Sequence, residues 1–306
     1  MDKATGFNAP SWQPGTAPVA VVMISLNEGH NLEAVLQNLA GWAQQVFLVD
    51  SYSQDDTVDI ALRNGVHVVQ REFGGFGDQW NFALRELPIT APWTMKLDPD
   101  ERLTNAMKRQ IEDSIRCGER DGFLLKRRLF FMGQPLPVRL NDLRLWRSGT
   151  ARMTEVTVNE HLVVEGSVGQ LEADIEHHDS PDLEHWLEKQ NRYTTAEAVS
   201  AYTQSNVSDT PNLLGSALQR RMWLKVNFHR VPGRFLALFL YHLLVQGVWR
   251  AGWVGVTWCR LRVMVMRLIE YKWREMELTG RMPVKRFYGP GKPDARVKQF
   301  PVATPK

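Results

Sequence analysis

Cysteine is scarce in this chain. Its 306 residues include only Cys117 and Cys259, which stand far apart and lack the paired spacing of zinc ligands. This scarcity excludes a disulfide framework and indicates a reducing compartment. The first 18 residues contain no apolar run of the kind that forms a signal peptide, so we expect a flexible N-terminal arm over residues 1–18.

A hydrophobic run long enough to cross a membrane is also missing. Residues 235–249 are mostly apolar, but this stretch is shorter than the roughly 20 residues that span a bilayer, and Arg250 ends it. Because an arginine side chain can reach the interface from within a bilayer, a re-entrant or single spanning helix over residues 235–259 stays open as an alternative to surface attachment.

Acidic residues are absent from residues 210–269. Residues 213–279 hold 11 lysines and arginines against three acids, a net +8 in a chain of net +3, and five of the 11 tryptophans. Basic side chains mixed with Trp and Leu are typical of an amphipathic helix on an anionic membrane surface. We therefore predict a helical membrane-associating region over residues 206–280, peripheral or monotopic on the cytoplasmic face of the inner membrane, and a tail over 281–306. The apolar content argues against a nucleic-acid partner.

The chain before residue 206 alternates strand and helix patterns. Continuous apolar, β-branched runs, typical of buried parallel strands, occur at residues 19–24, 46–49, 67–70 and 93–97. Apolar residues at helical spacing separate them, as at Leu32, Val35, Leu36 and Leu39. This order predicts a doubly wound, Rossmann-like α/β sheet in a domain over residues 19–205. Further strands are expected over 122–132, 142–147 and 156–164, and a helix over 182–202.

Three acids follow the strand expected at residues 93–97. Asp98, Asp100 and Glu101 surround Pro99, and clustered carboxylates repel one another unless a cation joins them. Mg²⁺ and Mn²⁺ prefer such oxygens and often bridge them to a substrate's phosphates. The cluster therefore indicates a metal-assisted site for a phosphorylated donor. The alternative is an acidic turn that starts the next helix.

Three segments at strand ends together resemble the nucleotide-sugar-binding signature of family 2 glycosyltransferases. They are Ser25-Leu26-Asn27-Glu28, the segment from Val49 to Thr57, and Leu97-Asp98-Pro99-Asp100-Glu101. The similarity is greatest to bacterial lipopolysaccharide-core β-1,4-glucosyltransferases, which also have a Gly/Phe-rich loop before a helix and a Lys-x-x-Arg-Tyr helix. The resemblance covers roughly residues 19–203 and implies a GT-A fold and an inverting transfer.

The resemblance also implies roles for single residues. The nucleotide-sugar would contact Ser25, Asn27, Glu28, Asp50, Ser53 and Asp98. Asp50 would accept the imide N–H of a uracil, although a carboxylate there can equally cap its turn. Backbone amides of the Asn27–Glu28 turn would face the nucleotide. Asp100, with Asp98, would bind the Mn²⁺ or Mg²⁺ that bridges the diphosphate.

An inverting transfer needs a base that deprotonates the acceptor hydroxyl. We assign this role to Glu160, with Glu155 as the second choice. The sequence departs here from its relatives, which tend to have a histidine before the glutamate, whereas this chain has Asn159 before it and His161 after it.

Further polar residues are weaker candidates. One imidazole of the pair His177-His178 could complete the metal site, and we choose His178. Lys189, Arg192 and Tyr193 share one helix face and could hold phosphate or acceptor, while a solvated face is the alternative. Lys126 and Arg128, in a β run with Arg127, could line the acceptor side.

The predicted enzyme moves a hexose, in our first choice glucose from UDP-glucose, onto a lipid-linked saccharide of bacterial envelope glycan. One alternative is transfer to polyprenyl phosphate, whose nucleophile is already anionic and needs no base. Another, from a different class, is an inactive GT-A domain that serves as a membrane scaffold.

Overall fold

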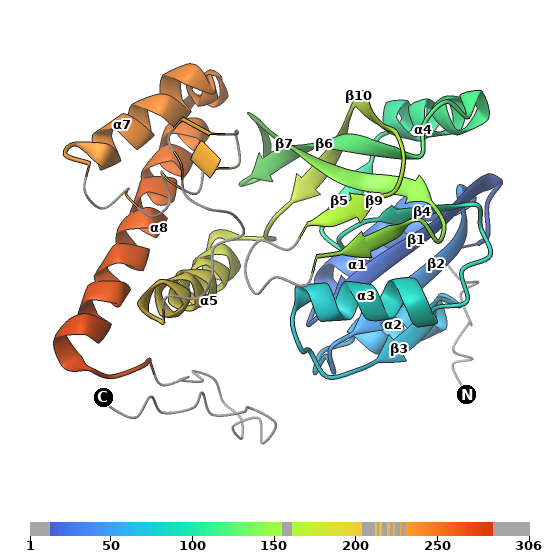
Figure 1. Cartoon of the computed structure of the whole chain (residues 1–306), viewed down its shortest axis with the longest axis horizontal. Helices are drawn as coiled ribbons and strands as arrows, with labels where there is room; N and C mark the ends of the chain where they lie inside the picture. The colour runs from blue at the N-terminus through green and yellow to red at the C-terminus, as the bar shows by residue number, and fades with distance from the viewer. Residues whose placement is uncertain are drawn as a thin grey trace, which may run out of the picture.

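The computed structural model describes most of the chain before residue 204 and the C-terminal helices. The described residues are 13–154, 161–203, 212, 214–215, 219–220, 223, 227 and 231–283. Within them the protein consists of a curled β-sheet flanked by helices and a separate group of C-terminal helices beside it (Figure 1).

Eight strands form the main sheet in the order β3-β2-β1-β4-β7-β6-β10-β5. The first four are β3 (His67–Gln70), β2 (Ala43–Asp50), β1 (Ala17–Ser25) and β4 (Trp93–Lys96), and they run parallel. Their apolar runs are buried, because helices cover both faces of this half of the sheet. The predicted α/β sheet is confirmed, and so are its first four strands, with extended ends on β1 and β2.

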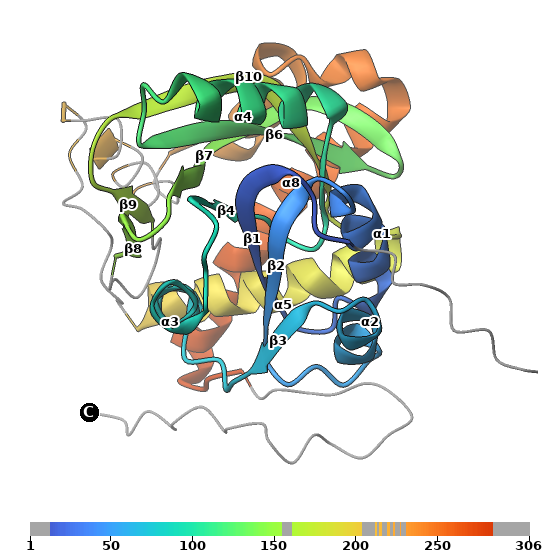
Figure 2. The same cartoon turned by 90° about the vertical axis from the view of Figure 1, so that its right-hand side faces the viewer.

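The helices divide between the two faces of the sheet (Figure 2). One face packs against α1 (Gly29–Leu39), α2 (Thr57–Arg63) and α4 (Asn105–Cys117), in a core that includes Leu32, Leu36 and Met107. The other face packs against α3 (Phe76–Glu86) through Trp80 and Ala83. The carboxyl ends of the parallel strands are thereby left at one edge, where ligands bind in such sheets.

The second half of the sheet curls back toward that edge. It contains the hairpin of β6 (Gly122–Phe131) and β7 (Gln134–Arg147), then β10 (Val168–His178). The short β5 (Glu101–Leu103), which the sequence patterns did not predict, follows β4 closely in the chain yet pairs with β10 at the far end of the strand order. In that pairing His177 lies opposite Glu101, so β10 meets the acidic turn. A small separate sheet joins β8 (Ala151–Met153) and β9 (Leu162–Val164).

The C-terminal helices pack on α5 (Leu183–Tyr202) and on the tip of the β6–β7 hairpin. They are α7 (Arg234–Leu240), η2 (Tyr241–Val245), η3 (Val248–Ala251) and α8 (Gly252–Thr279). Phe131, Trp186 and Trp258 lie in the shared core. Within the described residues no single helix has the length and apolar character to cross a membrane. The pair Arg234–Val245 and Val248–Thr279, bent by 72°, meets those two criteria when taken together.

Candidate active site

The loops after β1 and β2 are joined by hydrogen bonds. Asn27, in the left-handed region at φ 58°, begins this contact by donating its N–H to Ser53 Oγ at 2.8 Å. The next two amides continue it: Glu28 N–H donates to Thr57 Oγ1 at 2.8 Å and Gly29 N–H to Asp55 Oδ2 at 2.9 Å. The expectation that the amides of this turn face a nucleotide is therefore wrong, because side chains of the neighbouring loop already accept from them.

Asp50 is the centre of this pair of loops. It is fully buried, and its carboxylate accepts from Ser25 Oγ at 2.9 Å, Ser53 N–H at 2.8 Å and Gln70 Nε2 at 3.0 Å, as well as from the Ser53 hydroxyl. A carboxylate has about four acceptor positions, and these four donors occupy them. A ligand that bonded to Asp50 would have to displace one of these donors.

The acids after β4 fall into two groups. Asp98 and Glu101 are paired with arginines of the β6–β7 hairpin: Arg144 lies 3.1 Å from each of them, and Arg127 lies 3.2 Å from Glu101. Burial raises the pKa of Asp98, but Arg144, Lys96 and Arg127 outweigh it and hold that pKa well below its usual range. These two acids are thus already balanced by buried cations of the chain.

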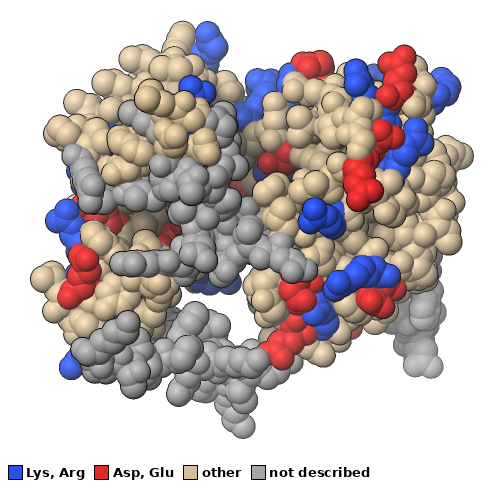
Figure 3. All heavy atoms as spheres, in the orientation of Figure 1, with Lys and Arg blue, Asp and Glu red and all other residues tan. Residues whose placement is uncertain are grey.

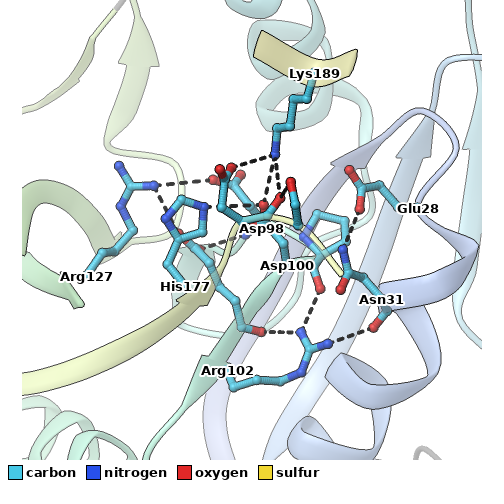
Figure 4. A network of polar contacts seen from close by, with 12 residues as sticks. Glu28, Asn31, Asp98, Asp100, Arg102, Arg127, His177 and Lys189 are labelled. Carbon is cyan, nitrogen blue, oxygen red and sulfur yellow. Dashed lines mark hydrogen bonds and ion pairs between the residues drawn. The ribbon is translucent and has the colours of Figure 1, made fainter. Parts of the chain in front are cut away.

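Asp100 is the acid that lacks an arginine. Its Oδ2 lies 3.3 Å from His177 Nε2 and 3.4 Å from Lys189 Nζ, while its buried Oδ1 has no hydrogen-bond partner among the described residues. Figure 4 shows Lys189 and His177 reaching these acids from different elements. Ligand atoms of Asp100, His177 and Asp179 lie within 4.8 Å of one another, a spacing that suits one metal ion.

The charge in this region also acts on Glu28, at the start of α1. Burial raises the pKa of its carboxyl group to about 7, against the hydrogen bond from Asn31 Nδ2 at 2.9 Å, and the negative charge of Asp100 adds to the rise. The opposite holds for Asp100. Burial raises its pKa as well, but the hydrogen bond and charge of His177, together with the charge of Lys189, outweigh burial and lower the pKa below its ordinary value.

Three of the predicted residues do not face this site: His178 on β10, and Lys126 and Arg128 on β6. His178 bonds to Glu176 at 3.1 Å and packs on Phe130, so the imidazole beside Asp100 is that of His177. The choice of His178 is therefore corrected to His177.

The residues of β6 divide in the same way. Lys126 pairs with Glu172, and Arg128 donates to the Leu136 carbonyl oxygen at 3.3 Å, whereas Arg127 faces the acids. Neighbouring residues of a strand point to opposite faces, so Arg127 is the residue of this run that meets the acids, and a place for Lys126 and Arg128 beside the acceptor stays a prediction.

On α5, Lys189 reaches the site as predicted, and Tyr193 is half exposed but lies near enough for the charges of Lys189, Asp179 and Asp100 to act on the pKa of its phenol, which burial raises. Arg192 is exposed on the same helix. Sequence reasoning missed Arg144 and Asp179. A charged residue inside the otherwise apolar run Leu143–Trp146 was the available signal for Arg144, because a charge within a buried strand needs a partner. The predicted base Glu160 and its alternative Glu155 lie outside the described residues, while His161 is exposed at the start of β9 beside Thr154.

Comparisons with known proteins give a family model and sequence relatives for this chain. The family model described as glycosyl transferase family 2 matches residues 20–165. The lipopolysaccharide core biosynthesis glycosyltransferase LpsC of Rhizobium meliloti (strain 1021) is 28% identical over 193 residues, which cover 59% of this chain and 70% of LpsC. A glycosyltransferase of Rickettsia prowazekii (strain Madrid E) is 24% identical over 202 residues, which cover 61% of this chain and 68% of that protein.

Solved structures of similar shape include the mannosyltransferase PcManGT from Pyrobaculum calidifontis in complex with GDP-Man and Mn²⁺, with a TM-score of 0.49 and 13% identity over 88% of this chain and 90% of that one. Another is S. aureus TarS 1–349 in complex with UDP-GlcNAc, with a TM-score of 0.43 and 14% identity over 84% of this chain and 91% of that one. The family match and the sequence relatives carry the assignment: residues 20–165 match the glycosyl transferase family 2 domain, and the chain is a glycosyltransferase with a Rossmann-like α/β sheet.

Proposed function

We propose that this protein is a metal-dependent, inverting glycosyltransferase that moves a hexose, glucose from UDP-glucose, onto a lipid-linked saccharide of bacterial envelope glycan. The similarity to LpsC supports an acceptor in the lipopolysaccharide core, and exopolysaccharide is the related alternative. The observation that carries the metal-dependent chemistry is the orphaned, buried Oδ1 of Asp100, a residue that shares one metal-sized group with His177 and Asp179. A buried carboxylate oxygen without a donor is costly unless a cation binds it.

Asp100, His177 and Asp179 would hold Mn²⁺ or Mg²⁺. Their oxygen and imidazole ligands suit either ion, and a bound ion would stabilise the negative charge of the departing nucleoside diphosphate without a proton. Asp98, which we first placed beside Asp100 as a metal ligand, forms a second such group with Asp100 and Glu101, whose ligand atoms also lie within 4.8 Å of one another. We favour the group with His177 and Asp179, because Arg144 already lies 3.1 Å from Asp98. The remaining acceptor capacity of Asp98 suits a ribose hydroxyl of the donor.

The base of the nucleotide is assigned to the pair of loops after β1 and β2. In this proposal a uracil imide replaces one of the donors that now bond to Asp50. Ser25 and Ser53 keep the Asp50 carboxylate oriented, and Asn27 keeps the two loops together. Glu28, whose carboxyl pKa burial raises to about 7, bonds to Asn31 and lies within the influence of Asp100 and Lys189, so we assign it to the phosphate side of the donor.

Glu160 is the proposed base toward the acceptor, and Glu155 the alternative. If the acceptor is a polyprenyl phosphate, the attacking oxygen is already anionic and neither residue is needed as a base. The two acceptors therefore differ in what the loss of Glu160 does to the rate.

The C-terminal helices supply the proposed membrane contact. An elbow patch of exposed apolar side chains follows α7, η2, η3 and the start of α8: Leu236, Leu240, Leu244, Val245, Trp249 and Trp253. Arg250 lies among them, and residues 231–269 contain no acid. Over α7 the surface in Figure 3 is largely tan, with blue and no red. Apolar and cationic groups together favour binding to an anionic bilayer. Such binding on the cytoplasmic face of the inner membrane would hold the active site near its lipid-linked acceptor.

A thermal-shift screen of UDP- and GDP-sugars, with and without Mn²⁺, tests the donor and the metal together. We expect a UDP-sugar to stabilise the protein when Mn²⁺ is present, and we expect EDTA or Asp100→Asn to abolish sugar transfer. Transfer that survives complete chelation contradicts the metal assignment. Stabilisation by UDP and Mn²⁺ with no sugar release on any membrane extract would favour the inactive scaffold.

A further inference from the structure

The proposed metal site already contains a cation of the chain. Lys189 Nζ lies 2.9 Å from Asp179 Oδ1 and 3.4 Å from Asp100 Oδ2, and it donates to the Asp179 carbonyl oxygen at 3.0 Å. The three side chains are 16%, 17% and 8% exposed in the order Lys189, Asp179 and Asp100, so water screens this group weakly. The ammonium therefore neutralises two of the three residues that would bind a metal.

A divalent ion and this ammonium compete for the same oxygens. Metal–carboxylate bonds are about 2 Å long for Mg²⁺, so an ion between Asp100 and Asp179 would lie within a few ångströms of Nζ. Like charges at that separation repel strongly where water is largely excluded. The lysine must therefore leave the acids when the metal enters.

Lys189 is built to move. Its flexible four-carbon stem carries three rotatable donors, so the ammonium can leave the acids while its backbone stays in α5. The helix itself is held independently, because Lys272 of α8 donates to Asn191, Thr194 and Thr195 of α5. A lysine that swings while its helix stays needs a new partner, and the diphosphate of a nucleotide-sugar is an anion that would enter the same site.

We propose that Lys189 is an exchangeable counter-ion: it holds Asp100 and Asp179 in the absence of metal, gives them up to the divalent ion, and then binds the donor diphosphate. This inference rests on the metal site of the proposed function. Its consequence is cooperative loading. The metal alone must displace a cation that gains no new partner, whereas metal and nucleotide together give that cation a phosphate.

The test compares full-length wild type, Lys189→Met and Lys272→Met in their affinity for Mn²⁺, measured by electron paramagnetic resonance of the free ion, with and without UDP. Removal of the competing charge should make Lys189→Met bind Mn²⁺ alone at least about tenfold more tightly than wild type. The factor by which UDP strengthens Mn²⁺ binding should shrink in the same variant. Lys272→Met, which loosens α5 but leaves the acids untouched, should match wild type.

Two results would overturn the exchange. In the first, the Lys189→Met protein binds Mn²⁺ no more tightly than wild type, and the Asp100→Asn protein does not bind it. The metal site would then stand, but the lysine would not compete for it. The other is an equal gain in Lys272→Met, which would trace the effect to a shifted helix. If Asp100→Asn binds Mn²⁺ and UDP as wild type does, the metal site itself is misplaced and the role of Lys189 is lost with it.

Discussion

Replacement of Arg144 by methionine should strongly destabilise the protein. The Arg144 side chain is 3% exposed and lies 3.1 Å from Glu101, which is fully buried, and 3.1 Å from Asp98. Breaking a buried ion pair by removing one partner costs about 3–5 kcal/mol, because the other charge stays buried. Since Arg127 still bonds to Glu101 at 3.2 Å and Asp98 is 31% exposed, we expect the lower end, about 3 kcal/mol.

Urea unfolding followed by tryptophan fluorescence measures this loss. Arg139→Met is the matched control, because Arg139 lies on the same strand and pairs with Asp174 at 2.7 Å but is 43% exposed, so its loss should cost less than about 1 kcal/mol. Adding Glu101→Gln to Arg144→Met should restore part of the stability, because it removes a buried carboxylate that has kept only one of its two arginine partners. The reasoning is refuted if Arg144→Met lies within about 1 kcal/mol of wild type, or if the second substitution adds its full cost to the first.

Other predictions concern rate, attachment and pH. Glu160→Gln should lower single-turnover transfer by about 10²–10⁴-fold at unchanged UDP-sugar affinity, whereas near-wild-type transfer would point to Glu155 or a phosphate acceptor. The double variant Trp249→Ser, Trp253→Ser should sediment less with anionic liposomes at low salt than wild type does, and high salt should weaken wild-type binding. Unchanged sedimentation of the variant would exclude the elbow patch as the membrane contact. Because the pKa of Glu28 rises from 4.5 to about 7 on folding, the folded protein binds more protons than the unfolded chain between these values, and stability falls as pH rises through them. Glu28→Gln should therefore be more stable than wild type at pH 8, by on the order of 1–3 kcal/mol, and as stable as wild type at pH 4. Urea unfolding at the two pH values measures this difference, and equal stability of the two proteins at both values would mean that this carboxyl is not buried.

Local patterns predicted the elements that lie in one stretch of chain. The buried run of β4 followed at once by Asp98 and Asp100 placed the acids at the carboxyl edge of a parallel sheet, which the structure confirms. The helical spacing of Leu32, Val35, Leu36 and Leu39 likewise predicted α1, because these residues lie in one stretch of chain and form one buried face. The bent arrangement of the C-terminal helices was not predicted, since it depends on what packs against the tip of the β6–β7 hairpin.

The sequence did not show which face of each strand carries the site residues. Alternation states that His177 and His178 point to opposite sides, but it does not say which side carries the acids. That choice is made by the pairing of β10 with β5, in which His177 lies opposite Glu101.

By itself, the sequence determined the chemistry available to this protein: acids at strand ends, a basic tryptophan-rich region, and the alternating strands and helices of an α/β sheet. The tertiary structure decided which of those groups meet. Arg144 pairs with Asp98, and Lys189 reaches Asp100, across 46 and 89 residues of chain. Such contacts follow from how the sheet curls and where α5 docks, and these depend on packing among distant segments that no local pattern contains.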